Sequence, residues 1–178
     1  MYSLNEKVVY PGHGVASINR VIEKSIAGKS TKFFELKFLN KDMTILLPID
    51  NIIAAGVRKL SSDKNIEAIF NLLQEPVDDI MKNSEFFKAS SWNKRSKQYQ
   101  FRLRSGNIVE ISKIYRDLQY VSQKKGLSFG EKNLLSQTES LLAQEISLVK
   151  NVVEESAVER LRSFFKGATL YSKITISV

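Results

Sequence analysis

The chain contains no cysteine, which excludes disulfide bridges, thiolate metal sites and a cysteine nucleophile. It has a single histidine and only three prolines in 178 residues. No apolar run approaches the roughly 20 residues that a membrane-spanning helix needs. The first residues also lack the basic and apolar regions of a signal peptide. We therefore expect a soluble, cytoplasmic protein without a membrane partner.

Motifs for catalysis and for metal binding are also missing. His13 lies in a glycine-rich turn, and no acid or nucleophile stands near it in the sequence. Residues 27–30 mimic the end of a phosphate-binding loop, but strand patterns on both sides predict a hairpin turn instead. The acidic pairs at 78–79 and 154–155 are adjacent in sequence, and adjacent side chains do not converge on one point. We expect no catalytic residue, no metal, no cofactor and no small-molecule substrate.

Acidic residues are outnumbered, with 19 against 27 lysines and arginines, for a net charge of +8. Residues 82–104 hold seven basic residues and one acid, and they also contain the single tryptophan, Trp92. Cations beside a large flat ring suit a polyanion whose bases can be stacked on or wedged apart, which indicates nucleic acid. The alternative is a core tryptophan on a helix whose other face is solvated lysine and arginine. The composition leaves both readings open.

Residues 1 to about 60 have the alternating pattern of short β-strands. Turns rich in glycine, proline or asparagine separate strand patterns over residues 7–10, 15–22, 32–39 and 43–47. Four or five strands at this spacing are too few for a sandwich. They predict a small Tudor-like or SH3-like β-barrel.

Beyond Leu60 the apolar period changes from two to about 3.6, which predicts helices. Ser61 or Ser62 can cap the first helix, which stops before Pro76. A helix is expected over about 91–104, and the next carries an apolar face from Ile111 to Val121 and ends at residues 124–126. Another opens at Ser128 and carries apolar residues from Leu134 to Val149, and a last one covers about 153–165. The fourth begins with the spacing of a capping box, Ser128 and Glu131.

The predicted fold class is therefore α+β. We expect a β-barrel domain over residues 1–60, an all-α helical-bundle domain over residues 61–165, and a C-terminal tail over residues 166–178 of unknown role. Residues 78–90 show little periodicity and are interpreted as a connector.

This order of elements, with several short motifs, resembles the CarD family of bacterial transcription regulators. The resemblance extends to about residue 165. Each motif is weak alone, but together they are specific: Val8-Val9-Tyr10-Pro11-Gly12-His13-Gly14-Val15, Leu47-Pro48, Gly56-Val57-Arg58, Trp92-Asn93-Lys94-Arg95, and Gly126-Leu127-Ser128 with Glu131-Lys132.

The resemblance implies a non-catalytic regulator that binds the β subunit of bacterial RNA polymerase through its barrel. The helical domain would reach promoter DNA at the upstream edge of the melted bubble. There a solvent-facing Trp92 would wedge into the minor groove and slow the collapse of the bubble. Lys94, Arg95, Lys97 and Lys132 are then expected to contact phosphates.

The same resemblance suggests positions that contact the polymerase. Lys24 matches a basic contact position, and Leu46 stands where an arginine is usual. The missing charge could come from Lys37, Lys32 or Lys41. Two other functions remain open from the residues: an RNA- or ribosome-associated binding protein, and a polymerase adaptor whose tryptophan is structural.

Overall fold

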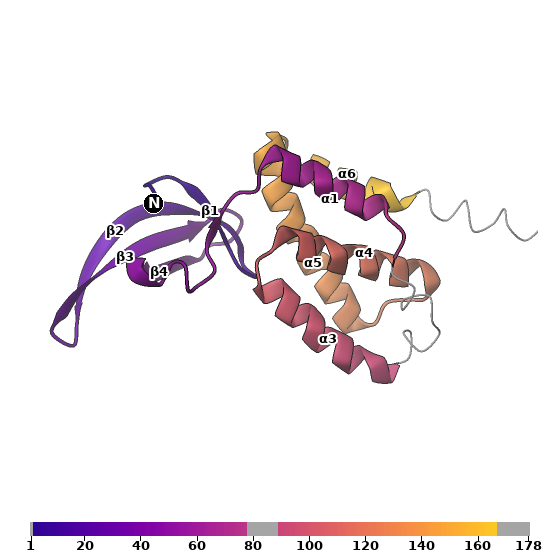
Figure 1. Ribbon diagram of the computed structural model, residues 1–178, viewed down its shortest axis with the longest axis horizontal. Helices are drawn as coiled ribbons and strands as arrows, with labels where there is room; N and C mark the ends of the chain where they lie inside the picture. Colours follow the sequence, from indigo (N-terminus) through magenta and orange to yellow (C-terminus); the bar gives the residue numbers. More distant parts are fainter. Residues whose placement is uncertain (1, 78–88, 167–178) are drawn as a thin grey trace, which may run out of the picture. The chain divides into compact units, whose positions relative to one another are not determined.

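The computed structural model describes residues 2–77 and 89–166. The expected connector falls mostly outside the described residues, as does all but the first residue of the expected tail. The chain divides into two compact units, with the boundary between Leu60 and Ser61. Strands make up the first unit and helices the second, as Figure 1 shows. The predicted α+β class is confirmed.

The first unit is a five-stranded antiparallel sheet with the order β4-β3-β2-β1-β5. Its strands are β1 (Lys7–Tyr10), β2 (Gly14–Ile26), β3 (Lys29–Phe38), β4 (Thr44–Pro48) and β5 (Arg58–Lys59). A short 3-10 helix, η1 (Ile49–Asn51), follows β4. One face of the sheet carries the core of this unit, in which Val8, Ile18 and Leu36 are fully buried.

The strands β2 and β3 are longer than the sequence pattern predicts, because the turn between them has only two residues. Ile26 pairs with Lys29, and both intervening residues have positive φ, 50° at Ala27 and 79° at Gly28. Two consecutive positive φ values define the type I′ turn that matches the twist of a hairpin. The segment that mimicked a phosphate-binding loop is therefore a hairpin turn, as predicted.

A β-bulge interrupts the pairing of β2 with β3. Ile18 pairs with Leu36, but the next pair in register is Arg20 with Glu35, so Asn19 is the extra residue. Side chains alternate between faces along a regular strand, so Arg20 would otherwise share the core face with Ile18. The bulge turns Arg20 to the opposite face.

The second unit contains five described helices: α1 (Asp63–Gln74), α3 (Ala89–Arg104), α4 (Ile108–Lys124), α5 (Phe129–Lys150) and α6 (Glu154–Lys166). Ser62 caps α1 by accepting a hydrogen bond from the amide of Asn65. The capping box of Ser128 and Glu131 opens α5, as the spacing predicts. These helix starts follow from local chemistry, since each cap satisfies amides that the first turn leaves free.

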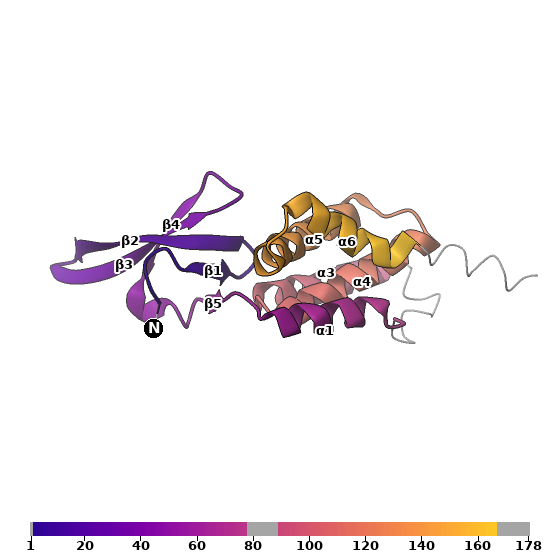
Figure 2. The ribbon, with the colours of Figure 1, turned by 90° about the horizontal axis from the view of Figure 1, so that it is seen from above.

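The helices surround one apolar core. In Figure 2, α5 and α6 lie on one side of this unit and α1, α3 and α4 on the other. The predicted apolar faces are those that are buried, including Ile66, Ile69, Phe70 and Leu73 of α1 and the α4 set. The α4 set comprises Ile111, Ile114, Tyr115, Leu118 and Val121. Among the described helices, none has the length and apolar character needed to cross a membrane.

Candidate nucleic-acid interface and polymerase-binding face

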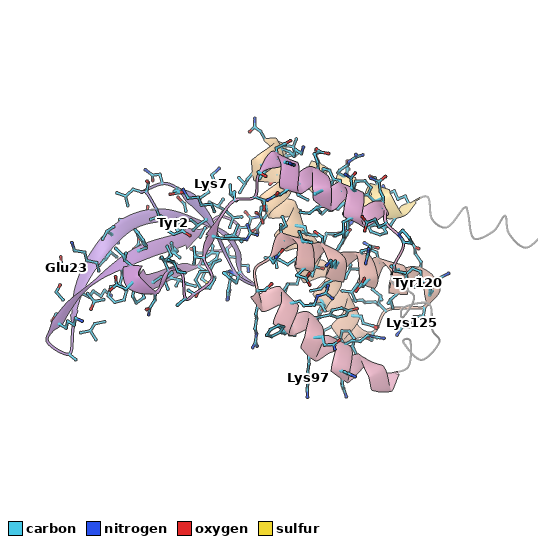
Figure 3. The ribbon with its side chains drawn as sticks, in the orientation of Figure 1. Tyr2, Lys7, Glu23, Lys97, Tyr120 and Lys125 are labelled. Atoms are coloured by element: carbon cyan, nitrogen blue, oxygen red, sulfur yellow. The ribbon has the colours of Figure 1, made fainter. Side chains whose placement is uncertain are left out.

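Helix α3 has two faces with different chemistry. At 3.6 residues per turn, Trp92, Arg95, Tyr99 and Leu103 fall on one side, and this side packs on the bundle. The opposite side is exposed and basic. It carries the cations Lys94, Lys97 and Arg104, together with the exposed Phe101. Lys97 projects away from the other helices in Figure 3. The tryptophan and the lysines of α3 therefore do not share a face.

Trp92 is half-buried and packs against the edge of the helical core. Its ring rests on the backbone of Gly130, the second residue of α5. A Cβ atom built on Gly130 would lie 3.1 Å from Cζ2 and 3.4 Å from Nε1 of the indole. The indole was expected to face solvent, and it is only partly exposed, because its packing on Gly130 covers part of the ring.

Arg95 lies beside this ring and is buried, with 7% of its surface exposed. Its Nη2 donates to Oε1 of Glu131 at 3.1 Å, and its guanidinium lies 5.8 Å from the centre of the indole ring. A side chain so enclosed does not fit the expected direct phosphate contact. The reason is the carboxylate of Glu131, which the sequence pattern had assigned only to a capping box.

Glu131 connects three elements around the tryptophan. Its carboxylate accepts hydrogen bonds from the backbone amide and the hydroxyl of Ser128, and it pairs with both Arg95 and Lys125. Burial tends to raise the pKa of this carboxyl, but the hydrogen bonds from Ser128 and the charge of Lys125 hold that pKa below its usual range. Glu131 is therefore a charged, 1% exposed residue that fixes α3 against the start of α5.

The expected phosphate contacts lie in two places. Lys132 is exposed on α5, directly after Glu131 and two residues from the seat of the indole. Lys94 and Lys97 are exposed on the far side of α3. Lys132 is two residues from Gly130 along α5, although the helical period of about 100° per residue turns it to a different side of α5 from Gly130.

The three residues named as polymerase contacts share one face of the sheet. Directly opposed residues of antiparallel strands project to the same face. Leu46 is opposite Glu35, and Glu35 is opposite Arg20. Lys37 is two residues from Glu35 along β3, and Lys24 is four residues from Arg20 along β2, so Lys24, Lys37 and Leu46 lie on the face opposite the core.

This strand face, defined by Lys24, Lys37, Leu46 and Arg20, includes a cation that the sequence analysis missed. Arg20 donates through Nε and Nη2 to the two carboxylate oxygens of Glu35, each at 3.0 Å. Its side chain is still 66% exposed. The face of Arg20 depends on the bulge at Asn19, which shifts the alternation by one residue. A single sequence does not reveal such a shift, so Arg20 could not be assigned to this face from the sequence.

Glu35 fixes the position of the Arg20 guanidinium through these two hydrogen bonds. Hydrogen bonds from Arg20 and then Asn19 lower the pKa of the Glu35 carboxyl, so this carboxylate stays charged at neutral pH. Lys32, which could also have supplied the missing charge, stands opposite Glu23 in the register of β2 and β3. It lies on the other face of the sheet. Lys41 donates to the backbone carbonyl of His13.

His13 itself packs its ring against two aromatic neighbours, Tyr10 at 5.4 Å and Phe38 at 6.0 Å between ring centres. Within residues 2–77 and 89–166, no cluster of three or more histidine, aspartate or glutamate side chains could hold a metal ion.

Matches to two family models define the class of this protein, one that binds RNA polymerase and acts in transcription. The family model for the CarD-like/TRCF RID domain, a Tudor-like fold, matches residues 2–61. The model for the CarD C-terminal domain matches residues 76–162. The chain belongs to the CarD family, a family of non-catalytic transcription factors.

Two curated proteins are similar to this chain over most of its length. "Putative transcription factor YdeB" of Bacillus subtilis (strain 168) is 23% identical over 155 residues, which cover 87% of this chain and 96% of that protein. "Putative ankyrin repeat protein" of Coxiella burnetii (strain RSA 493 / Nine Mile phase I) is 25% identical over 168 residues. These cover 94% of this chain but only 44% of that larger protein.

Proposed function

We propose that this protein binds the β subunit of RNA polymerase through its strand face and stabilises the open promoter complex through Trp92. The observation that carries the proposal is the half-buried indole, which rests on Gly130 and is flanked by Arg95. A ring held at one edge of a bundle, with a cation beside it, is suited to enter a step where base pairs have already separated.

For the polymerase contact, we propose that Arg20 supplies the charge that Leu46 does not. The two residues stand in one cross-strand row, with Glu35 between them. Two of the five N–H donors of Arg20 face Glu35, which leaves donors of the exposed guanidinium for an acidic partner. Leu46, which is 36% exposed, then adds an apolar contact next to this charge.

For the DNA contact, we propose that Trp92 and Lys132 act at the bubble edge. Arg95 is a positioning residue, because its ion pair with Glu131 holds α3 and the indole against α5. Lys94 and Lys97 act through long-range attraction for the phosphate backbone, since they lie on the other side of α3.

A wedge of this kind changes the equilibrium because it has different affinities for the two DNA states. Only separated base pairs can receive the ring, so binding favours the open complex. Stacking of one aromatic on a base is worth about 1 to 3 kcal/mol, which corresponds to roughly five- to a hundredfold in rate or equilibrium. The attachment to polymerase raises the local concentration, so a few phosphate contacts suffice.

The first test is the lifetime of a promoter open complex after a competitor is added, with the wild type and Trp92→Ala. We expect at least a fivefold shorter lifetime with the variant, because one stacking contact is lost. Thermal unfolding of both proteins shows whether the variant is folded. Equal lifetimes with a folded variant would reject the wedge.

The second test concerns the strand face. We expect Arg20→Ala to weaken the binding of RNA polymerase by the full-length chain. Lys32→Ala removes the same charge from the opposite face of the sheet and is the matched control. Equal retention of polymerase by the two variants would contradict the assignment of Arg20.

A second candidate function is a polymerase adaptor whose tryptophan is purely structural. The packing of Trp92 on Gly130 and on the core favours it. It predicts that Trp92→Ala lowers the melting temperature but leaves the lifetime of the open complex unchanged.

A further inference from the structure

Phe129 is 80% exposed, although it is a large apolar side chain. It is the first residue of α5, and the next residue is Gly130, the seat of the indole. A single exposed hydrophobic side chain is ordinary on a protein surface. Its position next to Gly130, on which the half-buried indole packs, is what requires an explanation.

The backbone at this point is held by several independent contacts. Ser128 and Glu131 cap the helix on either side of Phe129 and Gly130, and each accepts a hydrogen bond from the other's amide. Glu131 is tied in addition to Arg95. The backbone of Phe129 is therefore already fixed relative to the indole. Little conformational entropy of this segment is lost when a ligand binds.

The charge around Phe129 is positive. The carboxylate of Glu131 is 1% exposed and is paired with both Arg95 and Lys125, so it presents no negative charge to solvent. Lys132 is exposed one helical turn after Phe129, and Lys125 lies at the end of α4 in Figure 3. An exposed aromatic among cations matches a strand whose phosphates are anionic and whose bases are flat and apolar.

We propose that Phe129 is a second DNA-contacting residue, which stacks on or packs against an unpaired base next to the one that Trp92 engages. This inference rests on the proposed function, because the occupant is the separated DNA at the bubble edge. Phe129 and the indole that packs on Gly130 both lie at the start of α5. Lys125 and Lys132 attract the phosphates on either side. Two contacts instead of one increase the preference for melted over paired DNA.

Phe101 provides the matched control. It is 79% exposed, so it is as solvated as Phe129. It also stands among cations, Lys97 and Arg104, but on the side of α3 that faces away from the indole. The substitutions Phe129→Ala and Phe101→Ala thus remove the same side chain, at nearly the same exposure, from the start of α5 and from the outer side of α3.

The experiment measures the open-complex lifetime with RNA polymerase and four full-length proteins: wild type, Trp92→Ala, Phe129→Ala and Phe101→Ala. We expect Phe129→Ala to shorten the lifetime by about fivefold or more, the lower limit for one aromatic contact with a base, and Phe101→Ala to leave it unchanged. Phe129→Leu, which keeps the apolar volume without the ring, distinguishes stacking from simple wedging. Both phenylalanines are exposed, so the melting temperatures should match that of the wild type.

Three outcomes separate the two ideas. A short lifetime with Phe129→Ala, but not with Phe101→Ala, supports the second contact. Equal lifetimes of these two variants, with a shorter lifetime for Trp92→Ala, overturn the role of Phe129 and leave the proposed function intact. An unchanged lifetime with a folded Trp92→Ala refutes the proposed function itself.

Discussion

Gly130 offers a way to move the tryptophan without removing it. The new Cβ of Gly130→Ala would meet Cζ2 of Trp92 at 3.1 Å, which is 0.3 Å short of ordinary van der Waals contact at 3.4 Å. The indole is rigid, so the ring as a whole has to shift by a few tenths of an ångström. A methyl group of this kind tests whether the glycine is there to seat the ring.

Two opposing energies decide the stability of this variant. Overpacking of a tight contact costs about 1–3 kcal/mol, whereas alanine in place of glycine favours a helix by up to about 1 kcal/mol. We expect a net loss of about 1 kcal/mol in the free energy of unfolding, or roughly 4–8 °C in the melting temperature. Because the two terms partly cancel, the more decisive measurement is the environment of the ring.

Trp92 is the only tryptophan, so its fluorescence reports this site alone. We expect the emission of Gly130→Ala to move to longer wavelength and to be quenched more readily by a soluble quencher, because the displaced ring gains solvent. The open-complex lifetime should shorten as well, since the wedge is misplaced.

The control is Gly126→Ala, because a Cβ at Gly126 meets nothing within 4 Å. It leaves the contact of the indole with α5 untouched and should keep the emission of the wild type. If the two glycine variants show the same emission and the same melting temperature, the indole is not seated on Gly130 and the argument for a positioned wedge fails.

Three further predictions concern the residues around the indole. Glu131→Ala should lower the free energy of unfolding by about 3–5 kcal/mol, since it leaves the buried Arg95 without this carboxylate; a loss under 1 kcal/mol in chemical denaturation would contradict it. Because the pKa of Glu131 lies below its ordinary value of 4.5 in the folded state, its stabilisation is complete above that value. It should disappear as the pH falls through the folded-state pKa, and denaturation between pH 6 and about 2 should show a weaker pH dependence in Glu131→Ala. Finally, Lys132→Ala should reduce the slope of log affinity for forked DNA against log salt by about 1, whereas Lys94→Ala should not; equal slopes would argue against two distinct faces.

Local chemistry determined the helices and much of the sheet. The apolar period of 3.6 placed α1, α4 and α5, and the serine caps at Ser62 and Ser128 placed two of their first turns. The sequence also predicted a hairpin turn around Gly28, but the restriction of this turn to Ala27 and Gly28 came from the structure. These features depend on residues within one or two turns of each other, so a single sequence contains the information. Trp92 and its basic neighbours were likewise found from the sequence, as candidates for contact with nucleic acid.

Only the tertiary structure decided how these residues are arranged. It buried Arg95 against Glu131, 36 residues away, and it placed the indole on Gly130. It also turned Arg20 onto the face of Leu46 through one extra residue in β2. Such pairings depend on packing between distant segments and on the register between strands, and neither leaves a periodic trace in the chain. The sequence by itself determined which chemical groups are available, and the fold determined which of them are exposed together.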